Sequence, residues 1–109
     1  MKRGELWTIS GGAGIAGKPR PALIIQNDAY RDTEAVAICP ITSYGAETAV
    51  LRLSLQPGPE NGLREHSRVM IDKIITIPRS RLGRRIGALA QDDLVRVERA
   101  LTILLGLAG

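Results

Sequence analysis

The sequence predicts a mainly β fold, a small and strongly bent antiparallel barrel with one C-terminal α-helix packed on it. Three observations favour this class. Short apolar stretches suited to strands recur up to residue 89, turn residues separate them, and the apolar spacing changes to three- and four-residue steps after Asp92. The 109 residues contain neither a repeat nor a linker, which predicts a single domain over residues 1–109.

Three strands are expected in the first part of the chain. Residues 5–9, ELWTI, alternate between two faces, and residues 21–26, PALIIQ, form an apolar run that ends at the turn signal Asn27-Asp28. Residues 35–42, AVAICPIT, are apolar on both faces, as in a strand that is buried on both sides. Pro40 lacks an N–H, so we expect that end of the strand at an edge or a bulge.

Four more strands are expected after residue 48. Residues 49–55, AVLRLSL, alternate, with the leucines inward and Arg52 outward, and the turn PGPENG follows. Residues 67–72, SRVMID, alternate again, and shorter strands are expected at residues 74–77 and 84–89.

An amphipathic helix is expected from Asp92 onward. Asp92 and Asp93 would lie in its first turn, where negative charge is favourable. Its apolar positions are Leu94, Val97, Leu101, Leu104 and Leu105. The apolar excess at residues 100–107 nearly surrounds the last turns, and such a helix needs a second partner to cover it.

The composition limits the classes of function. A net charge of +4 favours a polyanion or an acidic protein as partner, while three aromatic residues are too few for an extended base-stacking platform. The single cysteine, Cys39, excludes an intrachain disulfide and is expected to be buried. No apolar run suits a signal peptide or a membrane span, so we expect a soluble, cytoplasmic protein.

One glycine-rich motif invites a dinucleotide-binding interpretation. GAGIAG, residues 12–17, matches G-x-G-x-x-G and follows an expected strand. The fingerprint requires a helix to begin inside this loop, but KPRP follows, and residues that precede proline are pushed out of the helical region. The sequence therefore favours a plain glycine-rich loop, and no dinucleotide cofactor is expected.

Arg20 lies between Pro19 and Pro21 at the start of an expected strand. The two prolines restrict the backbone, so little freedom is lost when the side chain binds something. A guanidinium is planar, permanently charged and forked, which suits phosphate oxygens. A structural arginine at a barrel rim is the alternative interpretation.

Five stretches carry a resemblance to a known family: KRGELW, RPALIIQND, ICPITS, VMIDKIITIP and LGRRIGALAQDDLVRVERAL. In this order and spacing, from Lys2 to about Leu105, the chain resembles the MazF/PemK-type toxins. The resemblance implies an SH3-like barrel with a C-terminal helix, a homodimer, and cleavage of single-stranded RNA at short sequences without metal or cofactor. It also implies products with 2′,3′-cyclic phosphate and 5′-hydroxyl ends, and a cognate acidic (MazE-like) antitoxin that covers the site.

The resemblance also assigns residues. It places Arg20, Thr42 and Asp72 in the catalytic site, with Ser43 beside Thr42. The run RSRLGRR, residues 79–85, holds four arginines in seven positions and could contact RNA phosphates or the acidic antitoxin, with a solvated face as the alternative. The RNA-binding candidates are thus Lys18, Ser43, Arg68, Arg79 and Arg81. A prepositioned guanidinium would stabilise charge that grows on the phosphate during attack by the ribose 2′-OH, and the Thr42 hydroxyl could donate to the same phosphate. For Asp72, a rim charge paired with Arg68 is the alternative.

The sequence departs from the family pattern in two places. Some relatives have an arginine two residues before the acid, where this chain has Met70, and Arg68 could reach in its place from the same strand face. Some also have a histidine in the first loop, which is absent here. His66 is the only imidazole, but a loop histidine after a turn is more often merely exposed.

Two other classes of function stay open on the sequence. A toxin of the same fold could poison a protein such as DNA gyrase by binding, although a pure binder has no need of Arg20 and Thr42. A barrel that binds nucleic acid without cleaving it, or a catalytically decayed toxin, is the other alternative, and Met70 and the missing loop histidine leave it open.

Overall fold

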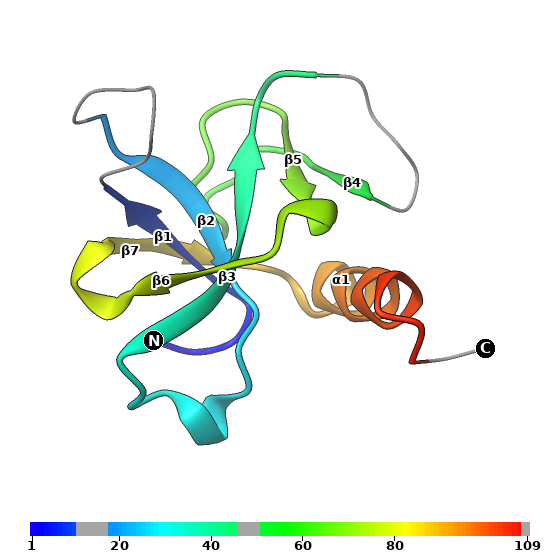
Figure 1. The fold of residues 1–109 in the computed structure, drawn as a ribbon. Coiled ribbons are helices and arrows are strands. Elements are labelled where there is room, and N and C mark those ends of the chain that lie inside the picture. The colour runs from blue at the N-terminus through cyan, green and yellow to red at the C-terminus, as the bar shows by residue number, and fades with distance from the viewer. Residues whose placement is uncertain (11–17, 46–50, 108–109) are drawn as a thin grey trace.

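The computed structural model describes residues 1–10, 18–45 and 51–107. In this part of the chain, seven strands are followed by one α-helix (Figure 1). The strands are β1 (Glu5–Ile9), β2 (Arg20–Ile24), β3 (Ala35–Thr42), β4 (Arg52–Leu55), β5 (Ser67–Met70), β6 (Ile75–Pro78) and β7 (Leu82–Ala88), and the helix is α1 (Gln91–Leu104). Single 3₁₀ turns form η1 (Asp28–Tyr30), η2 (Ile71–Lys73) and η3 (Arg79–Arg81).

All seven strands pair antiparallel, in the order β4-β5-β3-β2-β1-β7, with β6 also paired to β3. β3 is the longest strand and connects two parts of the sheet. Its first half pairs with β6, up to Ile38 and Ile75, and its end pairs with β5 from Ile41 and Val69 onward. Pro40 lies in the interval between these two pairings, where no ladder hydrogen bond is required of it.

The apolar core has two parts, one on each face of the sheet. Val97, Ala100 and Leu101 of α1 pack against one face. Strand residues of this part are Leu6, Leu23, Cys39, Ile41, Leu53, Leu55 and Val69, together with Leu63 and Ile71. The second part, on the other face, consists of Ile9, Ala22, Ile24, Val36, Ile38 and Ile77. The mainly β fold class with a C-terminal helix is confirmed, since one helix covers a curved antiparallel sheet (Figure 1).

Several predicted bounds were wrong by one to three residues. β2 begins one residue earlier than predicted and stops at Ile24, because the chain then turns and the Gln26 amide binds the Tyr30 carbonyl and the Ala37 N–H. β4 begins at Arg52, and residues 49–50 of its predicted range lie outside the described residues. β6 extends through Pro78, and β7 begins at Leu82 rather than at residue 84.

Two corrections concern side chains that matter below. The strand predicted over residues 67–72 ends at Met70, so Asp72 lies in the 3₁₀ turn η2. The helix begins at Gln91 and ends at Leu104, but its last apolar positions are not covered by the sheet: Leu104 and Leu105 are 39% and 57% exposed.

Within the described residues, no helix combines the length and the apolar character that crossing a membrane requires.

Candidate active site

Arg20 and Thr42 lie at the ends of neighbouring strands. Arg20 is the first residue of β2, and Thr42 is the last residue of β3. The pairing of the two strands ends at Ala22 and Pro40, so Arg20 and Thr42 each lie two residues beyond the last pair, at the same end of the two strands. On its other side Thr42 is paired with Arg68 of β5. We call Arg20, Thr42 and Arg68 the cationic row.

The three side chains of the cationic row share one face of the sheet. Residues paired across neighbouring strands point to the same side, and residues two apart along a strand do so as well. Ala22 and Ile24 lie two and four residues after Arg20 on β2, so they point to the same side as Arg20. Both belong to the second part of the core, which contains no residue of α1. The cationic row therefore lies on the face opposite α1, beyond the edge of this apolar cluster.

The charges of the cationic row are not neutralised within the described chain. Arg20 and Arg68 are half-buried, and the Nε atom of each is buried without a hydrogen-bond partner there. Neither guanidinium lies within ion-pairing distance of a carboxylate in residues 1–10, 18–45 and 51–107. Leaving a buried donor unpaired costs about 1–3 kcal/mol, which a bound anion would recover.

Thr42 has an oriented hydroxyl between the two arginines. Its Oγ1 accepts the backbone N–H of Tyr44 at 3.1 Å. This hydrogen bond uses an acceptor position of the oxygen and leaves the hydroxyl proton to be donated. A phosphate oxygen in the row could therefore receive hydrogen bonds from Thr42 and from a guanidinium together.

Asp72 forms a two-bonded ion pair with Arg52. The Arg52 Nε lies 3.0 Å from Oδ1, and Nη2 donates to Oδ2 at 3.0 Å. The alternative sequence interpretation, an ion pair of Asp72 with Arg68, was wrong. Arg52 is paired with Met70 across β4 and β5, two residues along the ladder from Ser54 and Arg68. Sequence alternation placed Arg52 outward, but the partnership with Asp72 depends on register and could not be seen.

The remaining predicted residues lie at different distances from the cationic row. Lys18 is exposed and Ser43 half-buried, and each is a chain neighbour of the row. Arg81 donates through Nε to the Ser10 carbonyl, next to Ile9, which is paired with Arg20. Arg81 therefore lies near the β1 side of the row. The loop of residues 12–17, with its glycine motif, lies outside the described residues.

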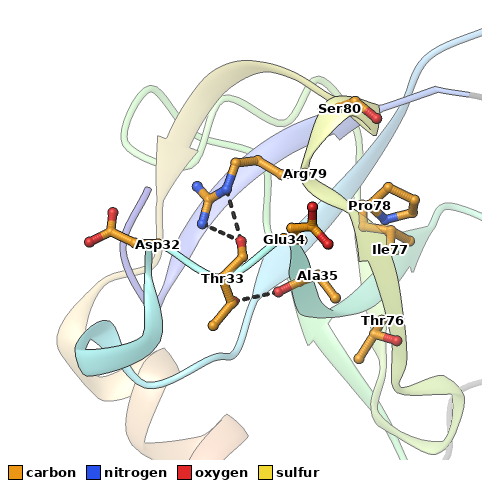
Figure 2. A pocket seen from close by; sticks show the side chains of 9 residues that line it. All are labelled: Asp32, Thr33, Glu34, Ala35, Thr76, Ile77, Pro78, Arg79 and Ser80. Atoms are coloured by element: carbon orange, nitrogen blue, oxygen red, sulfur yellow. Dashed lines mark hydrogen bonds between the residues drawn. The ribbon is translucent and has the colours of Figure 1, made fainter.

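Arg79 lies at the other end of β3. Ala35 is paired with Pro78, the residue before Arg79, and lies seven residues from Thr42, about 23 Å along a strand. Arg79 and Thr33 line a hollow of about 740 Å³. Figure 2 shows the Arg79 guanidinium turned toward Thr33. Its Nε and Nη2 donate to the Thr33 carbonyl at 3.0 and 2.7 Å, and Nη2 also donates to the Arg31 carbonyl.

This hollow is a poor candidate for an anion site. Asp32 and Glu34 contribute carboxylates to its lining, and the Arg79 guanidinium is directed at backbone carbonyls (Figure 2). The structure therefore brings Arg20, Thr42 and Arg68 together and separates them from Arg79. RNA contact by Arg79 stays a prediction.

The two candidates for proton transfer or nucleophilic chemistry differ in exposure. His66 is half-buried, precedes β5 and lies two residues from Arg68. Cys39 is fully buried, as expected, and burial together with the charge of Asp72 raises the pKa of its thiol to about 12. The thiol is therefore protonated at neutral pH and unsuited to nucleophilic work. No cluster of potential metal ligands occurs in the part of the chain that the structure describes.

Comparison with known proteins places the chain in a family. Over its full length it is 44% identical to the probable endoribonuclease MazF of Mycolicibacterium smegmatis and covers all of that protein. The solved toxin MazF-mt6 of Mycobacterium tuberculosis superposes with a TM-score of 0.80 at 26% identity, over 96% of this chain and 99% of that one. A mycobacterial endoribonuclease solved with its cognate antitoxin gives 0.79 at 25% identity, over 100% and 98%. Residues 2–105 match the family model, and the chain thus belongs to the PemK-like, MazF-like toxins of type II toxin–antitoxin systems.

Proposed function

We propose that this endoribonuclease toxin cuts single-stranded RNA at specific short sequences, without a metal, through attack of a ribose 2′-OH on the adjacent phosphate. Such an attack breaks the bond to the 5′ oxygen and leaves 2′,3′-cyclic phosphate and 5′-OH ends. The cationic row carries the proposal: two half-buried guanidiniums without a carboxylate partner in the described chain lie on either side of a hydroxyl. That arrangement suits a phosphodiester.

Each residue of the row has a role in this reaction. Negative charge grows on the phosphorus oxygens as the 2′ oxygen attacks, and Arg20 stabilises it from a fixed backbone position. Thr42 donates its hydroxyl proton to the same phosphate. Arg68 binds a further phosphate of the RNA. Lys18, Ser43 and Arg81, which lie near the row, make smaller contributions to RNA binding. A guanidinium holds its proton too firmly to serve as the base, so the role of Arg20 is electrostatic.

An acidic antitoxin is the second proposed partner. Two relatives, the mycobacterial endoribonuclease and MazF of Deinococcus radiodurans, were solved with an antitoxin or with MazE. A segment rich in carboxylates would pair with Arg20 and Arg68 and satisfy their unbonded Nε atoms. It would thereby exclude RNA from the cationic row.

A homodimer is also proposed, from the exposed end of the helix. Ile103, Leu105 and Leu107 are 58%, 57% and 75% exposed, and Leu104 lies beside them. A cluster of this kind at one end of a small protein favours an interface. Light scattering coupled to gel filtration should give twice the monomer mass, and Ile103→Glu with Leu105→Glu should return it to that of one chain. A monomeric parent chain would contradict the homodimer.

Mapping of RNA ends tests the function. The purified chain is incubated in EDTA with a long RNA that lacks stable structure, and the 5′ ends are mapped and tested for a free hydroxyl. We expect cuts at one short sequence. Arg20→Gln should slow cleavage about 100- to 1,000-fold, as loss of one oxyanion donor does, whereas Arg96→Ala on the helix should not.

Two outcomes would contradict the proposal. RNA that stays intact while DNA gyrase supercoiling is inhibited would indicate a toxin that acts by binding, and RNA that is bound but uncut would indicate a non-catalytic barrel. Cleavage at the full rate by folded Arg20→Gln protein would remove the proposed role of Arg20.

A further inference from the structure

Arg52 adds a third guanidinium to the face that carries the cationic row. It lies two residues before Ser54 on β4, and Ser54 is directly paired with Arg68. Arg52 therefore shares the face of Arg68 and is its diagonal neighbour, at a Cβ separation of about 7–8 Å. Its direct cross-strand partner is Met70, which has no charge to offer a phosphate. Positive charge at this step of the ladder thus comes from β4.

The Arg52 guanidinium is held in one orientation. Nη2 donates to Asp72 Oδ2 at 3.0 Å, and Nε lies 3.0 Å from the other oxygen, Oδ1, so the guanidinium faces both carboxylate oxygens. Nη2 uses one of the five guanidinium N–H groups in this hydrogen bond and Nε faces Oδ1, which leaves three N–H groups for another acceptor. The Arg52 side chain is 23% exposed, so the remaining donors can be reached from the sheet face.

We propose that Arg52 is a further RNA-binding residue, which contacts the phosphate next to the one held by Arg68, and that Asp72 is a positioning residue that fixes it. This inference rests on the proposed function. Both carboxylate oxygens of Asp72 are engaged by Arg52, so Asp72 acts through the arginine rather than as a proton carrier. The RNA then crosses the sheet from β2 over β3 and β5 to β4.

The ion pair makes the effects of substitution unequal. Arg52→Ala removes a phosphate contact and also leaves the Asp72 carboxylate facing the RNA without a partner. Arg52→Ala combined with Asp72→Asn removes the same phosphate contact, but it also removes the negative charge of Asp72 that would repel the RNA. Asp72→Asn alone keeps the positive charge of Arg52, and the asparagine carbonyl oxygen can still accept one hydrogen bond from the guanidinium. RNA affinity should therefore fall most for Arg52→Ala, less for the double variant, and little for Asp72→Asn.

Binding to RNA that resists cleavage measures this order. The probe is a single-stranded 2′-O-methyl RNA, in which the attacking hydroxyl is blocked, and affinity is read from fluorescence anisotropy over a range of salt concentrations. We expect Arg52→Ala to bind about ten-fold or more weakly and to lower the salt slope by about one, as loss of one phosphate contact does. Arg96→Ala is the control, because Arg96 also pairs with an aspartate at 3.0 Å but lies on α1, from which it contacts β4 only through the Ser54 backbone carbonyl.

Three results would overturn the inference. One is folded Arg52→Ala protein that binds as Arg96→Ala does. Another is a double variant that binds RNA no better than Arg52→Ala. The third is an Asp72→Asn variant whose kcat no longer falls at acid pH, because that loss would identify Asp72 as a proton carrier. If Arg52→Ala does not fold, Arg52→Lys tests the inference instead. It keeps the positive charge, so RNA binding should weaken while its dependence on salt concentration stays the same. A wild-type chain that binds the probe but leaves RNA uncut would refute the proposed function and still permit this comparison.

Discussion

Thr42 and Arg68 are directly paired residues of β3 and β5, and Arg20 begins β2 at the same end of the sheet, two residues beyond the last pair of β2 with β3. A hydroxyl thus lies between two guanidiniums that have no acidic partner in the described chain. Four other arginines are ion-paired, namely Arg3, Arg52, Arg85 and Arg96. Arg20 and Arg68 also differ from the arginines that have no ion pair, because within the described residues only these two have a buried Nε without a hydrogen-bond partner. A bound anion would supply that partner.

Replacing Arg68 should weaken RNA binding more than it slows the chemical step. In the proposed arrangement Arg20 meets the scissile phosphate, and Arg68 meets a neighbouring one. Arg68→Ala should therefore raise KM about ten-fold, as loss of one charge-assisted contact does, with a smaller change in kcat. Steady-state cleavage of a fluorogenic RNA measures both constants. Unchanged cleavage by folded Arg68→Ala protein would exclude Arg68 from the site.

Replacing Thr42 tests the oriented hydroxyl. Thr42→Ala removes the proposed phosphate donor and leaves the Tyr44 N–H without its side-chain acceptor. We expect kcat to fall by about two orders of magnitude at a similar KM, because the interaction is made mainly in the transition state. Thr42→Ser keeps both hydrogen bonds and should retain most activity. Equal losses in the alanine and serine variants would mean that packing, not the hydroxyl, is what Thr42 contributes.

The fold followed closely from local pattern where strands were bounded by turn residues. β1 and β3 have the predicted bounds, because an apolar run on each is enclosed by polar or glycine-rich sequence. The end of β5 was missed for a physical reason. Ile71 is buried and its N–H binds the Leu51 carbonyl, so a 3₁₀ turn keeps the same alternation of buried and exposed residues that a strand would have.

The candidate site could be predicted only in part. Arg20 was identifiable because the flanking prolines are local, and Thr42 because it ends a clear strand. The partner of Asp72 was not, since Arg52 precedes it by 20 residues and the pairing depends on the register of β4 with β5. Arg79 looked like one member of a charged run, but its hydrogen-bond acceptors lie 46 and 48 residues earlier in the sequence.

Arg79 is expected to affect stability. Its guanidinium holds the carbonyls of Arg31 and Thr33, and its own N–H binds the Glu34 carbonyl, so the side chain fixes the segment before β3 against η3. Arg79→Ala should lower the free energy of unfolding by about 1–2 kcal/mol, because the side chain makes several hydrogen bonds from a charged group. Urea denaturation measures this. A stability equal to the parent, combined with a loss of RNA affinity, would instead support the RNA contact that the sequence predicts.

Cys39 should make stability depend on alkaline pH. Burial and the nearby Asp72 charge raise the pKa of its thiol to about 12 in the folded chain, from an ordinary value of 9.0. A raised pKa means that the folded state holds the proton more firmly, so the contribution is fully present below about pH 9 and is lost as the pH rises toward 12. Between about pH 8 and about pH 10, the parent should lose roughly 1 kcal/mol more stability than Cys39→Ala. Iodoacetamide should label the thiol only as the chain unfolds, and rapid labelling of native protein would show that Cys39 is not enclosed by the core.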